Sequence, residues 1–244
     1  MMEDGTVVIE ENVFFQNAFL ELGANFIDKK HIIVEDNLAQ MILNHILKAE
    51  GLNDLLQVEF YPGGASNIKK YTILTYSKTR VPNRYILFDG DQKKDEIPDF
   101  TRIPEVDKTY EYLKDVFKKV VDIDVDKIDW GVDANRQAGR KNTQQGRELI
   151  LSYLEFYKTH VGFLPQIIPE DIIYNEERLK VLLGEDDFPD VSQEKNAKAK
   201  LKKISDITGQ SIDAIEYQLV YWFVKQKNSD YIDILTKLKD ILER

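Results

Sequence analysis

Two stretches of this sequence decide its fold: His31-Ile32-Ile33-Val34-Glu35-Asp36-Asn37 and Tyr85-Ile86-Leu87-Phe88-Asp89-Gly90-Asp91. Each begins with branched or aromatic residues and ends in carboxylates and turn formers. A short, continuous apolar run of this kind is typical of a strand buried on both faces in a parallel sheet. Parallel strands present functional groups at their carboxyl ends, so we expect the two acidic ends to meet at one sheet edge.

The segments between and around these strands predict an α/β fold, with a parallel sheet flanked by helices and an α-helical C-terminal extension. A β-α-β-α-β order at ordinary spacing predicts right-handed crossovers. The expected elements near the sheet are a helix over Leu38–Ala49, a strand at 58–61, a helix after Asn67 and the strand at 85–88. Further helices are expected at 11–22, Val106–Val121, Gln144–Thr159, Glu176–Leu183, Lys195–Ile207, Ile212–Val224 and Tyr231–Glu243.

Composition restricts the kinds of site that this chain can build. The chain has 244 residues with 43% hydrophobic and 31% charged residues, enough to bury a core. It has no cysteine and three histidines, which excludes disulfides and thiolate metal sites and argues against a multi-histidine centre. The acidic start and the lack of a long apolar run lead us to expect a cytoplasmic protein without a membrane segment. A net charge of −10 argues against coating nucleic acid over the whole surface, but allows one local basic face.

The carboxylates at the two strand ends favour a magnesium site. Glu35, Asp89 and Asp91 would repel one another unless they shared a cation or a proton. Magnesium prefers hard oxygen ligands, usually carboxylates with waters and substrate phosphates. Taken singly, Asp36 and Asn37 could cap a helix and Asp89-Gly90 could form a turn, but their joint occurrence at matching strand ends favours a shared function.

These residues resemble a Toprim domain, and more narrowly the Toprim nuclease module of overcoming-lysogenization-defect (OLD) proteins and related ATPase-linked nucleases. The resemblance covers roughly residues 8–175 and rests on Glu35, the Gly63-Gly64 turn and Asp89-Gly90-Asp91. It implies a nuclease that cuts nucleic-acid phosphodiesters with Mg²⁺ or Mn²⁺. It also implies an ABC/SMC-like ATPase, as a separate subunit or a missing domain, and a role in antiviral defence. We expect DNA rather than RNA as substrate, and an oligomer is compatible with this hypothesis.

The resemblance also implies roles for particular residues. Glu35, Asp89 and Asp91 would be catalytic residues and metal ligands. Glu170, with Asp36 or Asp171 assisting, would complete a second metal site. The family often carries a further acid one helical turn after the first glutamate, where this chain has Ala39, so the second metal stays an open question.

A cation is expected to stabilise the extra negative charge of the transition state. The candidates for it are Lys141, Arg140 and Lys69, with Lys141 as the first choice. Basic side chains could also line a track for phosphates, or could simply be solvated: Lys69, Lys70, Lys78, Arg80, Arg84, Arg136, Arg140, Lys141 and Arg147.

Two alternatives stay open at this point. A degenerate Toprim domain could act as a docking or regulatory subunit, as Ala39 suggests. A phosphoacceptor receiver-like domain could use Asp89 as its phosphorylated residue, although residues 92–165 contain no apolar strand ending in Ser or Thr. The expected division of the chain is an N-terminal helical segment (1–27), a Toprim catalytic domain (28–175) and a helical extension (176–244).

Overall fold

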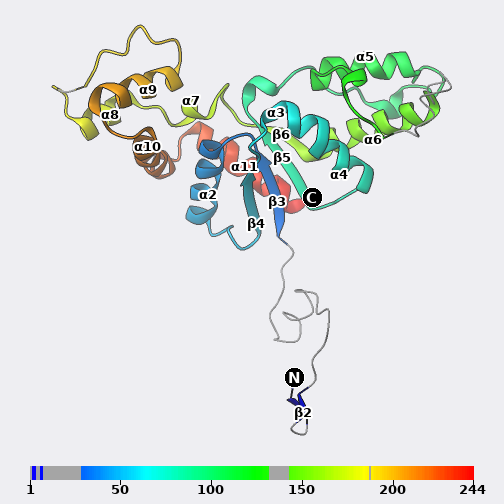
Figure 1. Cartoon of the computed structure of the whole chain (residues 1–244), viewed down its shortest axis with the longest axis horizontal. Helices are drawn as coiled ribbons and strands as arrows, with labels where there is room; N and C mark the ends of the chain where they lie inside the picture. The colour runs from blue at the N-terminus through cyan, green and yellow to red at the C-terminus, as the bar shows by residue number, and fades with distance from the viewer. Residues whose placement is uncertain (1, 4–5, 8–28, 132–142, 187) are drawn as a thin grey trace.

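A four-stranded parallel sheet forms the centre of the computed structural model, which describes residues 2–3, 6–7, 29–131, 143–186 and 188–244 (Figure 1). The strand order is β4-β3-β5-β6. The strands span Lys30–Val34 (β3), Leu56–Phe60 (β4), Arg84–Phe88 (β5) and Val161–Phe163 (β6). Met2–Glu3 (β1) and Thr6–Val7 (β2) form a separate antiparallel pair. The expected α/β class and the parallel pairing of the two acidic strands are therefore confirmed.

The two central strands bury side chains on both faces of the sheet. Ile33 of β3 lies opposite Ile86 of β5, and Val34 lies opposite Leu87. Successive side chains of a strand point to opposite faces, so the sheet separates two hydrophobic clusters. Ile33 and Ile86 belong to one cluster and Val34 and Leu87 to the other. This two-sided burial is why these strands are continuous apolar runs rather than alternating ones.

Two helical connections link the first three strands. Helix α2 (Asn37–Glu50) joins β3 to β4, with Asp36 as its N-cap and Gly51 at φ 70° as its C-cap. Between β4 and β5 the chain forms α3 (Gly64–Asn67), the π-helical η1 (Ile68–Ile73) and α4 (Leu74–Thr79). The sequence predicted a single helix here. The structure has a continuous helical run with a π-helical centre, a geometry that often occurs at functional sites.

The other helices that the sequence predicted within the described residues agree with the structure to within a few residues at their ends, whereas α7 was not predicted. Helix α5 begins at Tyr110 rather than Val106, because Thr109 caps its N-terminus. Strand β6 was not predicted, since a three-residue strand at the end of a helix has too few residues to show a period. The predicted helix at 11–22 lies outside the described residues. The other elements are η2 (Gly90–Gln92), η3 (Phe100–Arg102), α5 (Tyr110–Val121), η4 (Val125–Lys127), α6 (Thr143–His160), α7 (Pro169–Ile173), α8 (Glu176–Leu183), α9 (Ala197–Thr208), α10 (Ile212–Gln226) and α11 (Ser229–Glu243).

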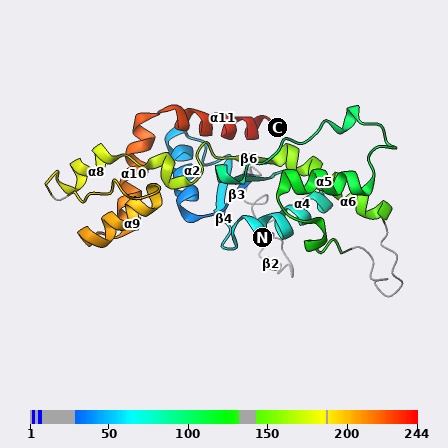
Figure 2. The ribbon, with the colours of Figure 1, turned by 90° about the horizontal axis from the view of Figure 1, so that it is seen from above.

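The C-terminal helices share a hydrophobic cluster with the sheet. Figures 1 and 2 show α8, α9 and α10 at one end of the molecule, α5 and α6 at the other, and α11 running from the α10 end toward the sheet. Leu219 of α10 and Leu238 of α11 are fully buried in the same cluster as Val34 and Ile42. The expected division at residue 176 stays a prediction, and buried contacts run across it. Among the described helices, none combines the length and apolarity required to span a bilayer.

Candidate metal centre

The order of the strands places a topological switch point at the carboxyl ends of β3 and β5. The name crevice is used for the part of the molecule around this point that carries Glu35, Asp36, Asp89, Asp91 and Glu170. From β3 the chain passes through α2 to β4 on one side, and it then returns to β5 on the other side of β3. Open α/β sheets bind ligands outside the strand ends at such a switch point. Glu35 follows β3 and Asp89 follows β5, so both predicted residues lie at this point. The backbone N–H of Asp89 donates a hydrogen bond to Glu35 Oε1 over 2.9 Å.

Asp89 is the most strongly perturbed carboxylate of this crevice. Its side chain is buried, with 9% of the residue exposed, and Oδ1 has no hydrogen-bond partner. Burial, together with the negative charges of four nearby carboxylates, raises the pKa of Asp89 to about 8: Glu35, Asp36, Asp91 and Glu170. Without a cation, Asp89 therefore carries a proton at neutral pH. A buried oxygen without a partner beside other acids is an arrangement that a bound cation would satisfy.

Asp91 and Gly90 are held by the segment that follows β6. The N–H of Gly90 donates to the carbonyl of Gln166 at 2.9 Å, and a Cβ on Gly90 would come within 2.4 Å of that oxygen. The close approach at Gly90 is therefore made by the backbone of the chain itself. Asp91 is exposed, and its Oδ1 accepts from Gln92 Nε2 at 2.9 Å. Burial raises the pKa of Glu35, and the negative charge of Asp91 adds to this effect.

Glu170 and Asp36 form the neighbouring part of the site. Glu170, at the start of α7, is 4% exposed, and its buried Oε2 has no partner. Asp36 Oδ1 accepts the N–H of Ala39 at 2.8 Å, so its role as a helix cap is confirmed. Burial raises the pKa of Asp36, and Glu170 raises it further. Asp171 lies on the same helix, and its Oδ1 is 3.4 Å from the N–H of Ala197.

Two further charged residues reach this part of the site from the C-terminal helices. Lys198 Nζ of α9 lies 3.0 Å from Glu170 Oε1. Burial raises the pKa of Glu216 on α10 to about 7, and Glu170 is the largest charged contributor. Sequence reasoning assigned neither residue to the site. Both are far along the chain from Glu170 in amphipathic helices, and no local pattern distinguishes them from other helix-surface charges.

Lys69 is the cation next to the carboxylates of the crevice. It lies in the π-helical η1, is 3% exposed, and donates from Nζ to Gln92 Oε1 at 2.8 Å. Its Nζ also lies 5.4 Å from the centre of the Phe88 ring. Burial lowers the pKa of Lys69, while Asp122 and Glu35 oppose this effect. A buried ammonium that is influenced by the charges of Glu35, Asp91 and Asp122 is a stronger candidate for charge stabilisation than an exposed one.

Of the other predicted cations, two make contacts elsewhere and three lie outside the described residues. Lys141 and Arg140 lie in 132–142, outside the described residues, and so does Arg136. Lys78 Nζ donates to the carbonyl of Trp130 at 2.5 Å, and Arg147 pairs with Glu105. The expected phosphate track therefore stays a prediction.

The donor atoms fit a hard divalent cation. Every candidate ligand is a carboxylate, the donor type that Mg²⁺ and Mn²⁺ accept, and both Asp89 Oδ1 and Glu170 Oε2 are buried without partners. Over the described residues, however, no three His, Cys, Asp or Glu side chains are close enough together to hold an ion as they stand. An ion held by Glu35, Asp89 and Asp91 would therefore require these carboxylates to come closer together.

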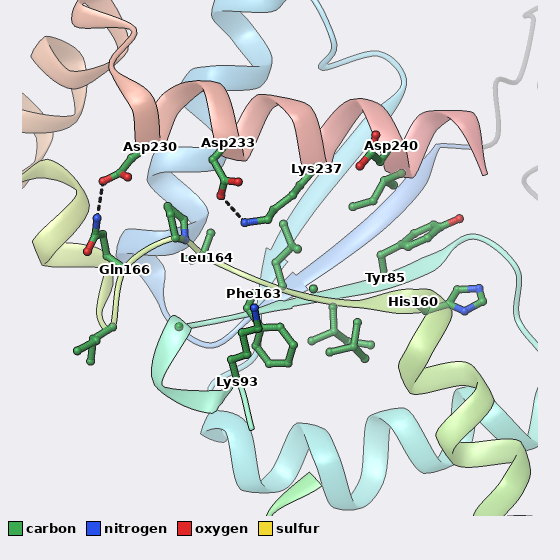
Figure 3. A pocket seen from close by; sticks show the side chains of 18 of the residues that line it. Tyr85, Lys93, His160, Phe163, Leu164, Gln166, Asp230, Asp233, Lys237 and Asp240 are labelled. Atoms are coloured by element: carbon green, nitrogen blue, oxygen red, sulfur yellow. Dashed lines mark hydrogen bonds and ion pairs between the residues drawn. The ribbon is translucent and has the colours of Figure 1, made fainter. Parts of the chain in front are cut away.

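A cavity of about 660 Å³ lies beside the crevice, between β6 and α11 (Figure 3). Gly90 belongs to its wall, whereas Glu35, Asp89, Asp91 and Glu170 do not. Two polar pairs lie in its wall: Gln166 donates to Asp230 of α11, and Lys237 pairs with Asp233 within α11. The cavity mixes acidic and basic side chains, so it presents no single charge to a ligand.

Comparisons with known proteins do not assign this site. No family model, no curated protein and no solved structure matches the chain. A function must therefore follow from the residues of the crevice and their chemistry.

Proposed function

We propose that this chain is a Toprim-type, divalent-metal-dependent nuclease that hydrolyses nucleic-acid phosphodiesters. The observation that carries the proposal is the direct contact at the switch point, where Glu35 accepts the Asp89 N–H while a buried Asp89 oxygen lacks a partner. Two acidic strand ends that meet in this way, with a raised pKa at Asp89, are typical of a functional site rather than of a structural turn. The strand order and the Asp89-Gly90-Asp91 loop fit the Toprim resemblance.

Each residue has a defined task in this proposal. Glu35, Asp89 and Asp91 would hold the ion, and Glu170 would contribute from α7. A bound Mg²⁺ or Mn²⁺ supplies Lewis-acid activation of water and neutralisation of the phosphodiester. Lys69 Nζ would stabilise the negative charge that develops on the phosphate oxygens. Its burial excludes water from around the ammonium, which strengthens this electrostatic effect.

The residues of the site support the proposed partners less directly than they support the proposed metal ion. The sequence contains no Gly-rich phosphate loop followed by Lys and Ser or Thr, so the ABC/SMC-like ATPase that the resemblance implies would be another subunit or domain acting with the nuclease. DNA is the first substrate to test, and a role in antiviral defence belongs to the same proposal. Cleavage inside the cytoplasm, with Mg²⁺ freely available, would suit a site built only from oxygen donors.

Cleavage of plasmid DNA and of RNA tests the proposal. Wild type, Asp89→Ala and Glu35→Gln would be compared with Mg²⁺ or Mn²⁺, with and without the ATPase. We expect both variants to lose about 100-fold or more in rate. Asp95→Asn, a change at an exposed carboxylate in the loop after Asp91, should cleave like wild type. Equal cleavage by all four proteins would exclude the assigned site.

A degenerate domain that docks but does not cut is the second candidate. It is favoured by Ala39, which is fully buried where the resembled family often has an acid, so no ligand can enter from this position. This candidate predicts no cleavage under any condition.

The receiver-like alternative has less support, because β6 is followed by Leu164-Pro165 rather than by Ser or Thr. Stoichiometric labelling by a small phosphodonor that is lost in Asp89→Asn would favour it.

A further inference from the structure

Strand β6 forms one edge of the central sheet, and a cavity lies along it. The strand order β4-β3-β5-β6 gives β6 a single neighbour, β5. Figure 3 shows α11 running beside β6, with the cavity of about 660 Å³ between them. The wall of the cavity includes Phe163, which packs on the α6 side of the sheet, and Leu164, which packs on the α11 side. The cavity therefore reaches the outer edge of β6, and its volume is typical of a ligand site.

The backbone of Phe163 has a hydrogen-bond donor and an acceptor that the fold leaves unused. The N–H of Leu164 donates to the carbonyl of Phe88 at 2.7 Å, so it points toward β5. Successive residues of a strand direct their backbone groups to opposite sides, so the N–H and the carbonyl of Phe163 point away from β5. Neither group hydrogen-bonds to any residue in the described part of the chain. The carbonyl of Val161, two residues earlier, points in the same direction.

The opposite edge of the sheet, strand β4, is partly covered by the chain itself. Gln40 of α2 donates from Nε2 to the carbonyl of Val58 at 2.9 Å, and the N–H of Leu56 donates to the carbonyl of Leu52 at 3.0 Å. Both bonds use backbone groups on the side of β4 that faces away from β3. Proteins usually cover such edges, because unpaired strand groups attract other extended chains. Over the described residues, no comparable bond covers Phe163 on the outer edge of β6.

Two charged side chains of the wall lie toward opposite ends of this edge. Lys93 lies toward the carboxyl end of β6, where its N–H donates to the carbonyl of Gly90 at 3.2 Å. Asp240 lies toward the amino end, one helical turn before Arg244, which donates to the carbonyl of Thr159. The side chains of Lys93 and Asp240 form no hydrogen bond or ion pair with any described residue. The cavity therefore offers an unpaired negative charge at one end and an unpaired positive charge at the other.

From these observations we propose that a peptide in extended conformation binds in this cavity and adds a fifth strand to the sheet beside β6. The peptide would accept the N–H of Phe163 and donate to the carbonyls of Phe163 and Val161. A basic side chain of the peptide would lie near Asp240 and an acidic one near Lys93. The ladder would end at Pro165, which has no N–H, so the pairing stays short. The ligand is an exposed, extended segment of a partner protein, and the proposal does not depend on the metal site.

Amide hydrogen exchange of the full chain without a ligand tests whether this edge is open. We expect the N–H of Phe163 to exchange at least about ten-fold faster than that of Leu164, which is bonded to the carbonyl of Phe88. Equal protection of the two amides would show that the edge is already covered, and it would overturn the proposal.

Peptides from a random heptapeptide library, displayed on phage and selected on the full chain without added metal, test the binding itself. We expect selected peptides to carry a basic residue toward one end and an acidic residue toward the other. A selected synthetic peptide should slow exchange of the Phe163 N–H by about ten-fold or more. Methylation of its backbone nitrogens, one at a time, should weaken binding about ten-fold at alternate residues, because only alternate residues of a strand face β6. A selection that yields no peptide with these properties overturns the proposal.

Charge reversal at the two ends of the cavity tests the placement of the peptide. Asp240→Lys and Lys93→Glu should each lower the peptide affinity about three-fold to ten-fold, since each replaces an attraction by a repulsion. Lys239→Glu changes an exposed neighbour of Asp240 that is not part of the wall, and it should bind the peptide as wild type does. Equal affinity of all four proteins would exclude this cavity as the peptide site, whatever the outcome of the cleavage assays.

Discussion

At the scale of one residue, Asp89 is a carboxylate whose ionised form is strongly disfavoured in the folded protein. Its pKa of about 8 lies far above the ordinary value of 3.8 because burial and four neighbouring acids penalise the ionised form. A divalent ion and a proton therefore compete for the same oxygens. Metal affinity should rise with pH up to about 8, and above it Asp89 no longer needs to release a proton.

The same shift predicts how stability depends on pH. Between about pH 4 and pH 8 the folded state holds a proton on Asp89 that the unfolded chain has lost, so without metal the stability falls as pH rises. Asp89→Asn removes this dependence. We expect the variant to match wild type near pH 4 and to exceed it by about 1–3 kcal/mol near pH 9 in urea unfolding with a chelator. A difference that is constant with pH would contradict this prediction.

Lys69 should matter for catalysis more than for substrate binding. Its Nζ donates to Gln92, and the charges of Glu35 and Asp91 act on it; in the proposed reaction it would stabilise charge that appears only in the transition state. We expect Lys69→Met to lower kcat by about 100-fold to 1,000-fold with a small change in KM. Lys48→Met, at an exposed lysine in the last turn of α2, serves as the control in single-turnover and steady-state cleavage assays. A change confined to KM would assign Lys69 to substrate binding instead.

At the scale of one element, Asp36 combines two roles that substitution can separate. Its carboxylate caps α2 through the N–H of Ala39 and also faces Glu170. Asp36→Ala should cost about 1 kcal/mol of stability through loss of the cap, whereas Asp36→Asn keeps it. If Asp36 is also a ligand, both variants should weaken Mn²⁺ binding equally. Thermal unfolding and metal titration of the two variants provide the comparison, and unaltered Mn²⁺ binding would leave Asp36 as a cap alone.

The loop after β5 depends on a glycine for packing between two backbone segments. Gly90→Ala would place a methyl group 2.4 Å from the Gln166 carbonyl, and backbone cannot move aside as a side chain can. We expect a loss of about 2–4 kcal/mol and weaker metal binding, because Asp89 and Asp91 flank this position. Gly209→Ala is the control: its φ is positive, but the Cβ would meet no atom within 4 Å, so about 1 kcal/mol is expected. Equal losses in denaturant unfolding would argue against the clash.

At the scale of the whole molecule, the C-terminal helices should be needed for folding. Leu219 and Leu238 are fully buried against the same cluster as α2 and the sheet. A chain ended at residue 175 would expose this apolar face to water. We expect it to aggregate or to lose near-ultraviolet circular dichroism and cooperative unfolding, while Leu238→Ala in the full chain costs about 2–5 kcal/mol. A stable, cooperative fragment 1–175 would support the division at residue 176.

The sequence was sufficient for the parts of the fold that have local signals. The two continuous apolar runs predicted the buried strands β3 and β5 and the meeting of Glu35 with Asp89, because burial on both faces leaves a visible pattern. Caps at Asp36 and Gly51 predicted the bounds of α2 within a residue. Strand β6 was missed because its three residues show no period. Glu216 and Lys198 were missed because only tertiary packing of α9 and α10 brings them to Glu170.

The order in which the acidic residues occur along the chain has a consequence for synthesis. Glu35 and Asp89 emerge early, Glu170 follows, and Glu216 appears only when α10 is made. The parallel pairing of β5 with β6 also waits for residues 161–163, so contacts across the sheet are distant in sequence and form slowly. A nascent chain that is still being translated therefore lacks the complete crevice. We expect a nuclease of this design to acquire its ions, and with them any capacity to cut, only close to the end of its own translation.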